Sequence, residues 1–304
     1  MNVKCHIQEM KGNLLREDHP LYKRIIGEKP IWWRLINNDK DLYVEIRKGN
    51  IIDVYYQGSR VAQITMKNSQ FVATAHPKYI DDNVSEEDPN YYRKSESKKG
   101  IAFNAIYQDC MNLISTKEGL AIMKKRIETV NATEDTDNIE STSEKCIQGK
   151  LIIENRNLYL DSEFAYKLLA KPRSRKTIRF DLVKIENNKL IFVELKRFWD
   201  SRMRTSKGNP EIIEQMTNYR NFIEENKCVL LSYYKTLYMI KKNLGLSVPQ
   251  IDDIDKLSIV PNPQLLIAMC HEDSKHGEGA KKDREDYIKN KLGTINIEPQ
   301  FWNI

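Results

Sequence analysis

Two acidic residues and a lysine occur together in the middle of the chain, within an otherwise apolar stretch that is predicted to fold into a β-hairpin. Apolar runs rich in β-branched residues flank Asn187-Asn188, and asparagine tolerates the positive φ that a two-residue hairpin loop requires. That loop places Asp181 opposite Glu194, with Lys196 two residues further along the same face. Opposed carboxylates repel each other, and a divalent cation bound through carboxylate oxygens would remove the conflict.

An ordinary cross-strand ion pair on a solvent-facing surface would use the same residue types. The tripeptide Glu-x-Lys also recurs in this chain, starting at Glu9, Glu96 and Glu225, so on its own it identifies nothing. None of those copies ends an apolar strand that has an aspartate opposite it across a hairpin. The context therefore favours a metal-binding, catalytic interpretation.

The elements around the hairpin predict an α/β core with a mixed sheet. Pro210 is expected to open a long helical pattern that continues through Leu244, with a break near Asn226. The C-terminal end is expected to be loose. The other predicted elements are a helix over Glu144–Glu154, a strand from Leu158, the hairpin strands Ile178–Ile185 and Leu190–Leu195, a strand over Leu265–Cys270 and a helix around Arg284–Leu292.

The first part of the chain predicts a separate accessory α+β domain. Residues 1–30 are polar and expected to be irregular, and residues 31–80 show a period of two with turn residues between short runs. Short connections predict an antiparallel meander. Its expected strands are Leu42–Arg47, Ile51–Tyr56, Arg60–Met66 and Gln70–Ala75, and two helices, Ile101–Ile114 and Glu118–Val130, are expected to follow.

Residues 131–143 are acidic and rich in hydroxyl side chains, which is the clearest linker composition in the chain. The predicted organisation is therefore an accessory domain over 1–130, a linker over 131–143 and a second domain over 144–304.

The order of elements in the second domain, together with Asp181 and Glu194-Leu195-Lys196, resembles the PD-(D/E)xK nuclease superfamily, which has the restriction-endonuclease-like fold. The resemblance covers roughly residues 144–270. Phe180 stands where the family name has proline, at a position that varies among relatives. The catalytic trio itself is intact.

A second motif supports this resemblance. Gln215-Met-Thr-Asn-Tyr219 has the Gln-x-x-x-Tyr spacing that RecB-like members carry on the helix after the catalytic lysine. Residues i and i+4 share one helix face, so both side chains could point to the same phosphate or water. An ordinary helix face also produces this spacing, and its position after Lys196 is what favours the catalytic interpretation.

The resemblance implies Mg²⁺-dependent hydrolysis of phosphodiester bonds, with DNA as the expected substrate and Mn²⁺ as an alternative metal. Lys196 would orient the attacking water and stabilise the charge that builds on the phosphate. Dimers are frequent among relatives, so a homodimer is compatible. The expected metal ligands are Asp181, Glu194, the Leu195 carbonyl and, from the first core helix, Glu144, with Glu154 and Glu163 as alternatives.

Positive charge is concentrated around the hairpin. The whole chain has a net charge of +6, but residues 166–210 contain thirteen Lys or Arg against four Asp or Glu. This distribution indicates a polyanion partner, although a solvated basic face would look the same. The candidate phosphate contacts are Lys171, Arg173, Arg175, Lys176, Arg197, Arg202, Arg204 and Lys207.

Composition excludes several other classes of function. At 304 residues and a mean hydropathy of −0.62, the chain has no apolar run near the ~18 residues of a membrane helix, and its start shows no apolar signal region. The five scattered cysteines fit a reducing cytoplasm, and no P-loop or dinucleotide fingerprint occurs. The alternative to a nuclease is a non-catalytic nucleic-acid-binding or protein-interaction subunit that retains the nuclease fold.

Overall fold

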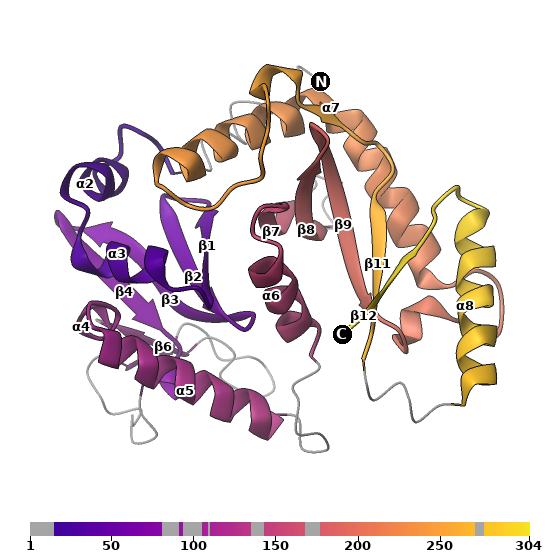
Figure 1. Cartoon of the computed structure of the whole chain (residues 1–304), viewed down its shortest axis with the longest axis horizontal. Coiled ribbons are helices and arrows are strands. Elements are labelled where there is room, and N and C mark those ends of the chain that lie inside the picture. The colour runs from indigo at the N-terminus through magenta and orange to yellow at the C-terminus, as the bar shows by residue number, and fades with distance from the viewer. Residues whose placement is uncertain are drawn as a thin grey trace. The chain divides into compact units, whose positions relative to one another are not determined.

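The computed structural model describes residues 15–80, 91–93, 105–108, 110–134, 143–167, 177–270 and 277–304. The chain divides into two compact units, each with its own sheet (Figure 1). The first unit is drawn from residues 1–154 and 236–247, and the second from residues 155–235 and 248–304. The fold is mixed α/β, as the sequence predicts.

The first unit contains the predicted antiparallel meander, formed by β1 (Leu42–Arg47), β2 (Ile51–Tyr56), β3 (Ser59–Lys67) and β4 (Gln70–Ala75). Each tight turn contains residues with positive φ, for example Asn50 at 58°, Gly58 at 76° and Asn68 at 46°. These residue types adopt that conformation at low cost, which explains why the turns form where the sequence predicts them.

Two helices precede the meander, α2 (Pro20–Glu28) and α3 (Ile31–Asn38), so the expectation of irregular structure over residues 1–30 is wrong at α2, and its residues 1–14 lie outside the described part of the chain. The alternating pattern also does not extend back to residue 31. Trp32, Trp33 and Ile36 are the buried residues of α3, and that spacing matches one face of a helix.

After the meander the chain forms η1 (Pro77–Tyr79), β5 (Tyr91–Arg93), β6 (Ala105–Gln108), α4 (Met111–Ile114) and α5 (Lys117–Glu134). The sheet order is β1-β2-β3-β4-β6-β5. The helix predicted over Ile101–Ile114 is therefore wrong at residues 105–108. Those residues pair with β4, a long-range partner that local periodicity does not reveal.

Helix α6 (Glu144–Glu154) has the predicted bounds but belongs to the first unit, whereas the sequence places it in the second domain. A close approach of two glycines explains its packing. A Cβ on Gly149 would lie 2.4 Å from the backbone nitrogen of Gly58, and one on Gly58 would lie 2.0 Å from the carbonyl oxygen of Lys145. Glycine at both positions lets α6 contact the turn between β2 and β3.

The second unit is organised around β7 (Tyr159–Lys167), β8 (Thr177–Glu186) and β9 (Lys189–Arg197), which are antiparallel neighbours. Strand β11 (Gln264–Met269) pairs parallel with β9, and β12 (Gln300–Asn303) pairs parallel with β11. The short β10 (Ser258–Ile259) also pairs with β9. The remaining elements are η2 (Ser201–Met203), η3 (Ile254–Lys256) and α8 (Glu278–Gly293), with α7 (Glu211–Asn243) shared between the units.

Two predictions for this part of the chain are corrected. Helix α7 is continuous, without a break at Asn226, whose side-chain amide donates a hydrogen bond to the carbonyl of Phe222 one turn earlier. The C-terminal end is not loose, because β12 adds an edge strand to the sheet. Among the described residues, no helix combines the length and the hydropathy of a membrane span.

Candidate active site

The hairpin of β8 and β9 has the predicted register. Leu182 lies opposite Val193 and Glu186 opposite Lys189, with the two asparagines at the tip. Their φ angles are 50° and 57°, the conformation that the two-residue loop requires. Continued by one residue, this register places Asp181 across from Glu194.

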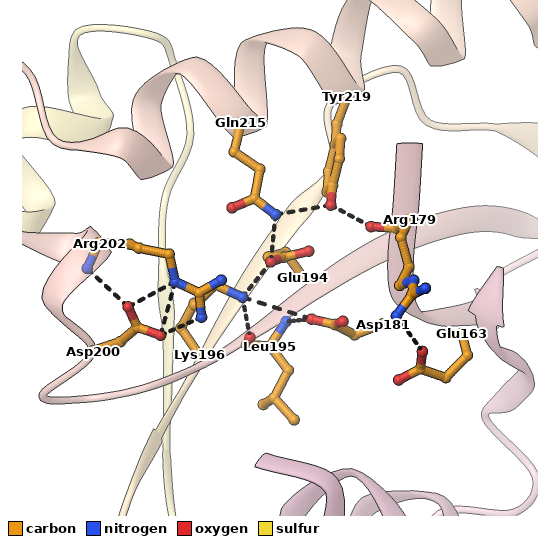
Figure 2. Close-up of polar contacts among 10 residues, drawn as sticks. All are labelled: Glu163, Arg179, Asp181, Glu194, Leu195, Lys196, Asp200, Arg202, Gln215 and Tyr219. Atoms are coloured by element: carbon orange, nitrogen blue, oxygen red, sulfur yellow. Dashed lines mark hydrogen bonds and ion pairs between the residues drawn. The ribbon is translucent and has the colours of Figure 1, made fainter. Parts of the chain in front are cut away.

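The three charged side chains of the predicted trio meet in this hairpin (Figure 2). The Lys196 ammonium donates hydrogen bonds to Glu194 Oε1 and, at 2.8 Å, to the Leu195 carbonyl, and its Nζ lies 3.9 Å from Asp181 Oδ2. Asp181 Oδ2 also accepts a 2.8 Å hydrogen bond from the Leu195 N–H. One ammonium therefore serves two carboxylates, which leaves the trio with a net negative charge when both are ionised.

Helix α7 brings the Gln-x-x-x-Tyr pair to the same carboxylate (Figure 2). The Gln215 amide donates to Glu194 Oε1 at 2.6 Å and to the Tyr219 hydroxyl at 2.8 Å, and that hydroxyl donates to the Arg179 carbonyl. The ring of Tyr219 packs on Phe180, with centroids 4.5 Å apart. Phe180, which precedes Asp181, is therefore in ring contact with a residue of the cluster.

The cluster is buried, and burial changes its ionisation. The side chains of Lys196 and Glu194 are 1% and 2% exposed, whereas that of Asp181 is 14% exposed. Burial, followed by repulsion from Asp181, raises the pKa of Glu194 to about 7. Burial also raises the pKa of Asp181, against the opposing effects of Lys196 and the Leu195 N–H. The pKa of Tyr219 is raised by burial and by the charge of Glu194, so its hydroxyl stays protonated.

The donor atoms of the cluster fit a hard divalent cation. Glu194 Oε2 is buried and accepts no hydrogen bond from any described residue, which leaves one carboxylate oxygen for another ligand. With Asp181 and the Leu195 carbonyl it forms an all-oxygen set of the kind that Mg²⁺ prefers. Within the described ranges, no three His, Cys, Asp or Glu side chains gather as a metal-binding group.

The predicted additional glutamates are divided between the two units. Glu144 is in the first turn of α6 and Glu154 is its last residue, so both belong to the first unit. Glu163 is in the second unit, on β7, where its neighbours Ser162 and Phe164 pair with β8 on either side of Asp181. Its φ is +55° and its carboxylate lies 3.5 Å from the Arg179 guanidinium.

The predicted basic residues divide into two groups. Lys171, Arg173, Arg175 and Lys176 lie outside the described residues. Of the others, Arg197 at the end of β9 and Arg204 and Lys207 beyond it are exposed. Arg202 is partly exposed and is held by Asp200. The backbone N–H of Arg202 donates a 2.8 Å hydrogen bond to the Asp200 carboxylate, and Nε of Arg202 donates one of 2.9 Å.

Two residues that support this segment are not identifiable from the sequence. Asp200 is ionised beside Arg202: burial opposes ionisation, but the hydrogen bonds from Arg202 outweigh it and lower the carboxyl pKa. The buried Arg284 of α8 donates to the carbonyls of Phe198 at 2.7 Å and Asp200 at 2.8 Å. More than 80 residues separate these partners, so no local pattern could have indicated the contact.

Comparisons with protein-family models, curated proteins and solved structures find no match for this chain.

Proposed function

We propose that the chain is a metal-dependent nuclease that hydrolyses phosphodiester bonds, with DNA as the expected substrate. The observation that carries the proposal is the meeting of Asp181, Glu194 and Lys196, in which Glu194 Oε2 is buried and accepts no hydrogen bond from the described part of the chain. Two buried carboxylates that share one lysine destabilise a hairpin through burial and mutual repulsion. The same arrangement suits the chemistry of a metal-assisted hydrolase.

The arrangement of the second unit supports the resemblance to the PD-(D/E)xK superfamily and its restriction-endonuclease-like core. Strands β7, β8 and β9 form an antiparallel run, α7 follows, and β11 then pairs parallel with β9. The resemblance depends on this order of elements preceded by the helix α6, and α6 belongs to the first unit. The Gln215 amide contact with Glu194 adds the RecB-like feature to the same site.

Asp181, Glu194 and the Leu195 carbonyl would hold Mg²⁺, or Mn²⁺ in its place. When bound, the metal would supply a nucleophile at neutral pH and neutralise charge on the phosphate. Glu194 would bind the metal in its ionised form. The raised pKa favours a proton on this carboxyl, so metal binding would release that proton.

The chain's own groups would do the remaining work. Lys196 would orient the attacking water and stabilise the negative charge that develops on the phosphate oxygens. Gln215 and Tyr219 would hold the carboxylate of Glu194 in one orientation, because both belong to a single hydrogen-bonded chain that ends at the Arg179 carbonyl. Exposed basic residues after β9 would contact the phosphate backbone and position it without selecting a sequence.

The test is a cleavage assay with the purified chain on labelled single- and double-stranded DNA and RNA, in Mg²⁺, Mn²⁺ or EDTA. We expect cleavage only with metal, and a loss of about 100-fold or more in Glu194→Gln and Lys196→Met. Glu186→Gln, an exposed change on the same hairpin, is the matched control and should cleave like the wild type.

Thermal melting of each variant separates lost catalysis from lost folding. Cleavage that persists in EDTA, or in both folded site variants, would refute the mechanism. If the wild type cleaves none of the substrates and binds nucleic acid without metal, the chain is instead a non-catalytic binding subunit.

A further inference from the structure

A groove on the first unit has no role in the proposed nuclease site. Its volume is about 640 Å³, and it lies between α3 and α5. Helix α3 lines it with Ile31, Arg34 and Leu35, and α5 lines it with Lys117, Leu120 and Ala121. Both sets have the spacing i, i+3, i+4, so each helix contributes one continuous face.

Leu120 of the groove lining is buried in the core of the unit at 3% exposure, but the apolar residues that α3 contributes to the groove are not needed for that core. Helix α3 already buries Trp32, Trp33 and Ile36 on its other side. Ile31 remains 58% exposed, the largest exposed fraction among the large apolar side chains of the described residues. A helix with a second apolar face that stays in water indicates a surface for a partner.

The charges at the groove are unequally compensated. Lys124 is neutralised by Asp39, with Nζ 2.6 Å from the carboxylate, and by Asp41 at 3.0 Å. The side chains of Arg34 and Lys117, by contrast, make no hydrogen bond or ion pair with any described residue. The groove therefore offers two uncompensated cations beside an apolar floor.

We propose that this groove binds an acidic amphipathic helix of a partner protein. Apolar side chains of the partner would cover Ile31, Leu35 and Ala121, while its carboxylates would pair with Arg34 and Lys117. Two facing helix surfaces form the groove that a third helix fills by ridge-into-groove packing. The lining face of α3 runs from Ile31 to Asn38, about 10 Å at 1.5 Å per residue, so two turns of the partner span it.

The apolar floor favours a protein partner over a nucleic acid. A phosphate backbone would satisfy the two cations but would leave Ile31, Leu35 and Ala121 exposed to water. A partner helix satisfies both, because one face carries its apolar residues and the flanks carry its acids.

The experiment is a selection of displayed random 16-residue peptides on the immobilised full-length chain, followed by fluorescence anisotropy of the labelled winners. We expect selected peptides with apolar residues at i, i+3, i+4 and i+7 and glutamate or aspartate beside them. Binding should weaken at least tenfold in the double variant Arg34→Glu/Lys117→Glu and in Ala121→Glu, which puts a longer, negatively charged side chain at an exposed position of the groove lining.

Lys125→Glu is the control, since it makes the same change of charge on an exposed α5 residue outside the groove lining and should bind normally. The proposal is overturned if no such peptides are recovered, or if the groove variants bind them as tightly as the wild type. It is also overturned if a DNA oligonucleotide displaces the peptide competitively, or if Ala121→Glu dissociates a dimer of the chain in sedimentation. None of these outcomes depends on nuclease activity, so this proposal and the proposed function can fail separately.

Discussion

Glu194 is the residue at which stability and the proposed chemistry conflict most directly. Its carboxylate is buried beside Asp181, and one of its oxygens has no hydrogen-bond donor within the described part of the chain. Burying a charge without full compensation costs stability. Lys196 and Gln215 offset part of this cost through Oε1 alone. A site that remains under-compensated in this way is suited to receive a cation.

The pH dependence of stability follows from this conflict. Burial raises the pKa of Glu194 from its ordinary 4.5 to about 7, so the folded chain keeps a proton that the unfolded chain has already released in that window. The free energy of unfolding therefore decreases as the pH rises from 4.5 to 7. At about 1.4 kcal/mol per pKa unit, the decrease from this group is about 3 kcal/mol.

Glu194→Gln should lack this decrease, so we expect its stability relative to the wild type to increase by about 3 kcal/mol between pH 5 and pH 8. Urea denaturation of both proteins in EDTA across this range measures the difference. Glu186→Gln, on the same hairpin but exposed, should follow the wild type. Parallel curves for the wild type and Glu194→Gln would show that the carboxylate is ionised throughout.

At the scale of elements, the hairpin could be predicted because its determinants are local. Asn187 and Asn188 set the turn, and the turn sets which side chains face each other across only a few residues. The helix α6 was predicted with correct bounds for the same reason. Elements that depend on distant partners could not be predicted: β6 requires β4, and β12 requires β11.

The place of α6 is likewise decided by a contact that its own sequence does not display. Gly149 is an unfavourable residue for a helix, yet a side chain there would meet the backbone of Gly58 at 2.4 Å and that of Gln57 at 2.9 Å. Glycine at this position costs about 1 kcal/mol in helix propensity relative to alanine, but it allows α6 to pack closely against the β2–β3 turn.

Gly149→Ala should therefore destabilise the protein by about 2 kcal/mol, because the clash outweighs the gain in propensity. Gly27→Ala is the matched control, since a Cβ on this glycine of α2 would have no atom of a described residue within 4 Å, and we expect it to stabilise by up to about 1 kcal/mol. Urea midpoints of the two variants decide between these effects. If both alanines stabilise equally, the packing of α6 on the β2–β3 turn is looser than described.

At the scale of the whole molecule, the two units are not consecutive segments. The chain passes from the first unit to the second after residue 154, returns at residue 236 within α7 and leaves again after residue 247. A composition-based linker at 131–143 could not reveal this interleaving, because the returning segment is part of a helix whose pattern is continuous. One helix thus carries Gln215 at one end and residues of the first unit at the other.

The returning end of α7 forms a buried ion pair with the first sheet. Lys241 Nζ lies 2.6 Å from Glu45 Oε2, and both residues are at most 5% exposed. Glu45 is opposite the buried Asp53 in the pairing of β1 with β2, so the lysine brings positive charge to a place where two acids meet. Removing one partner of a buried pair typically costs 3–5 kcal/mol, since the remaining charge loses its compensation.

Lys241→Met should therefore lower the free energy of unfolding by about 3–5 kcal/mol, and the loss should appear in the first unit. Hydrogen exchange followed by mass spectrometry should show faster exchange in peptides of β1 and β2 than in those of β8 and β9. Lys242→Met, the adjacent and exposed position, should leave both sets of strands unchanged. Combining Lys241→Met with Glu45→Gln should recover part of the lost stability, because the uncompensated carboxylate is then gone. Uniformly faster exchange across both sheets would instead mean that the two units unfold as one cooperative body.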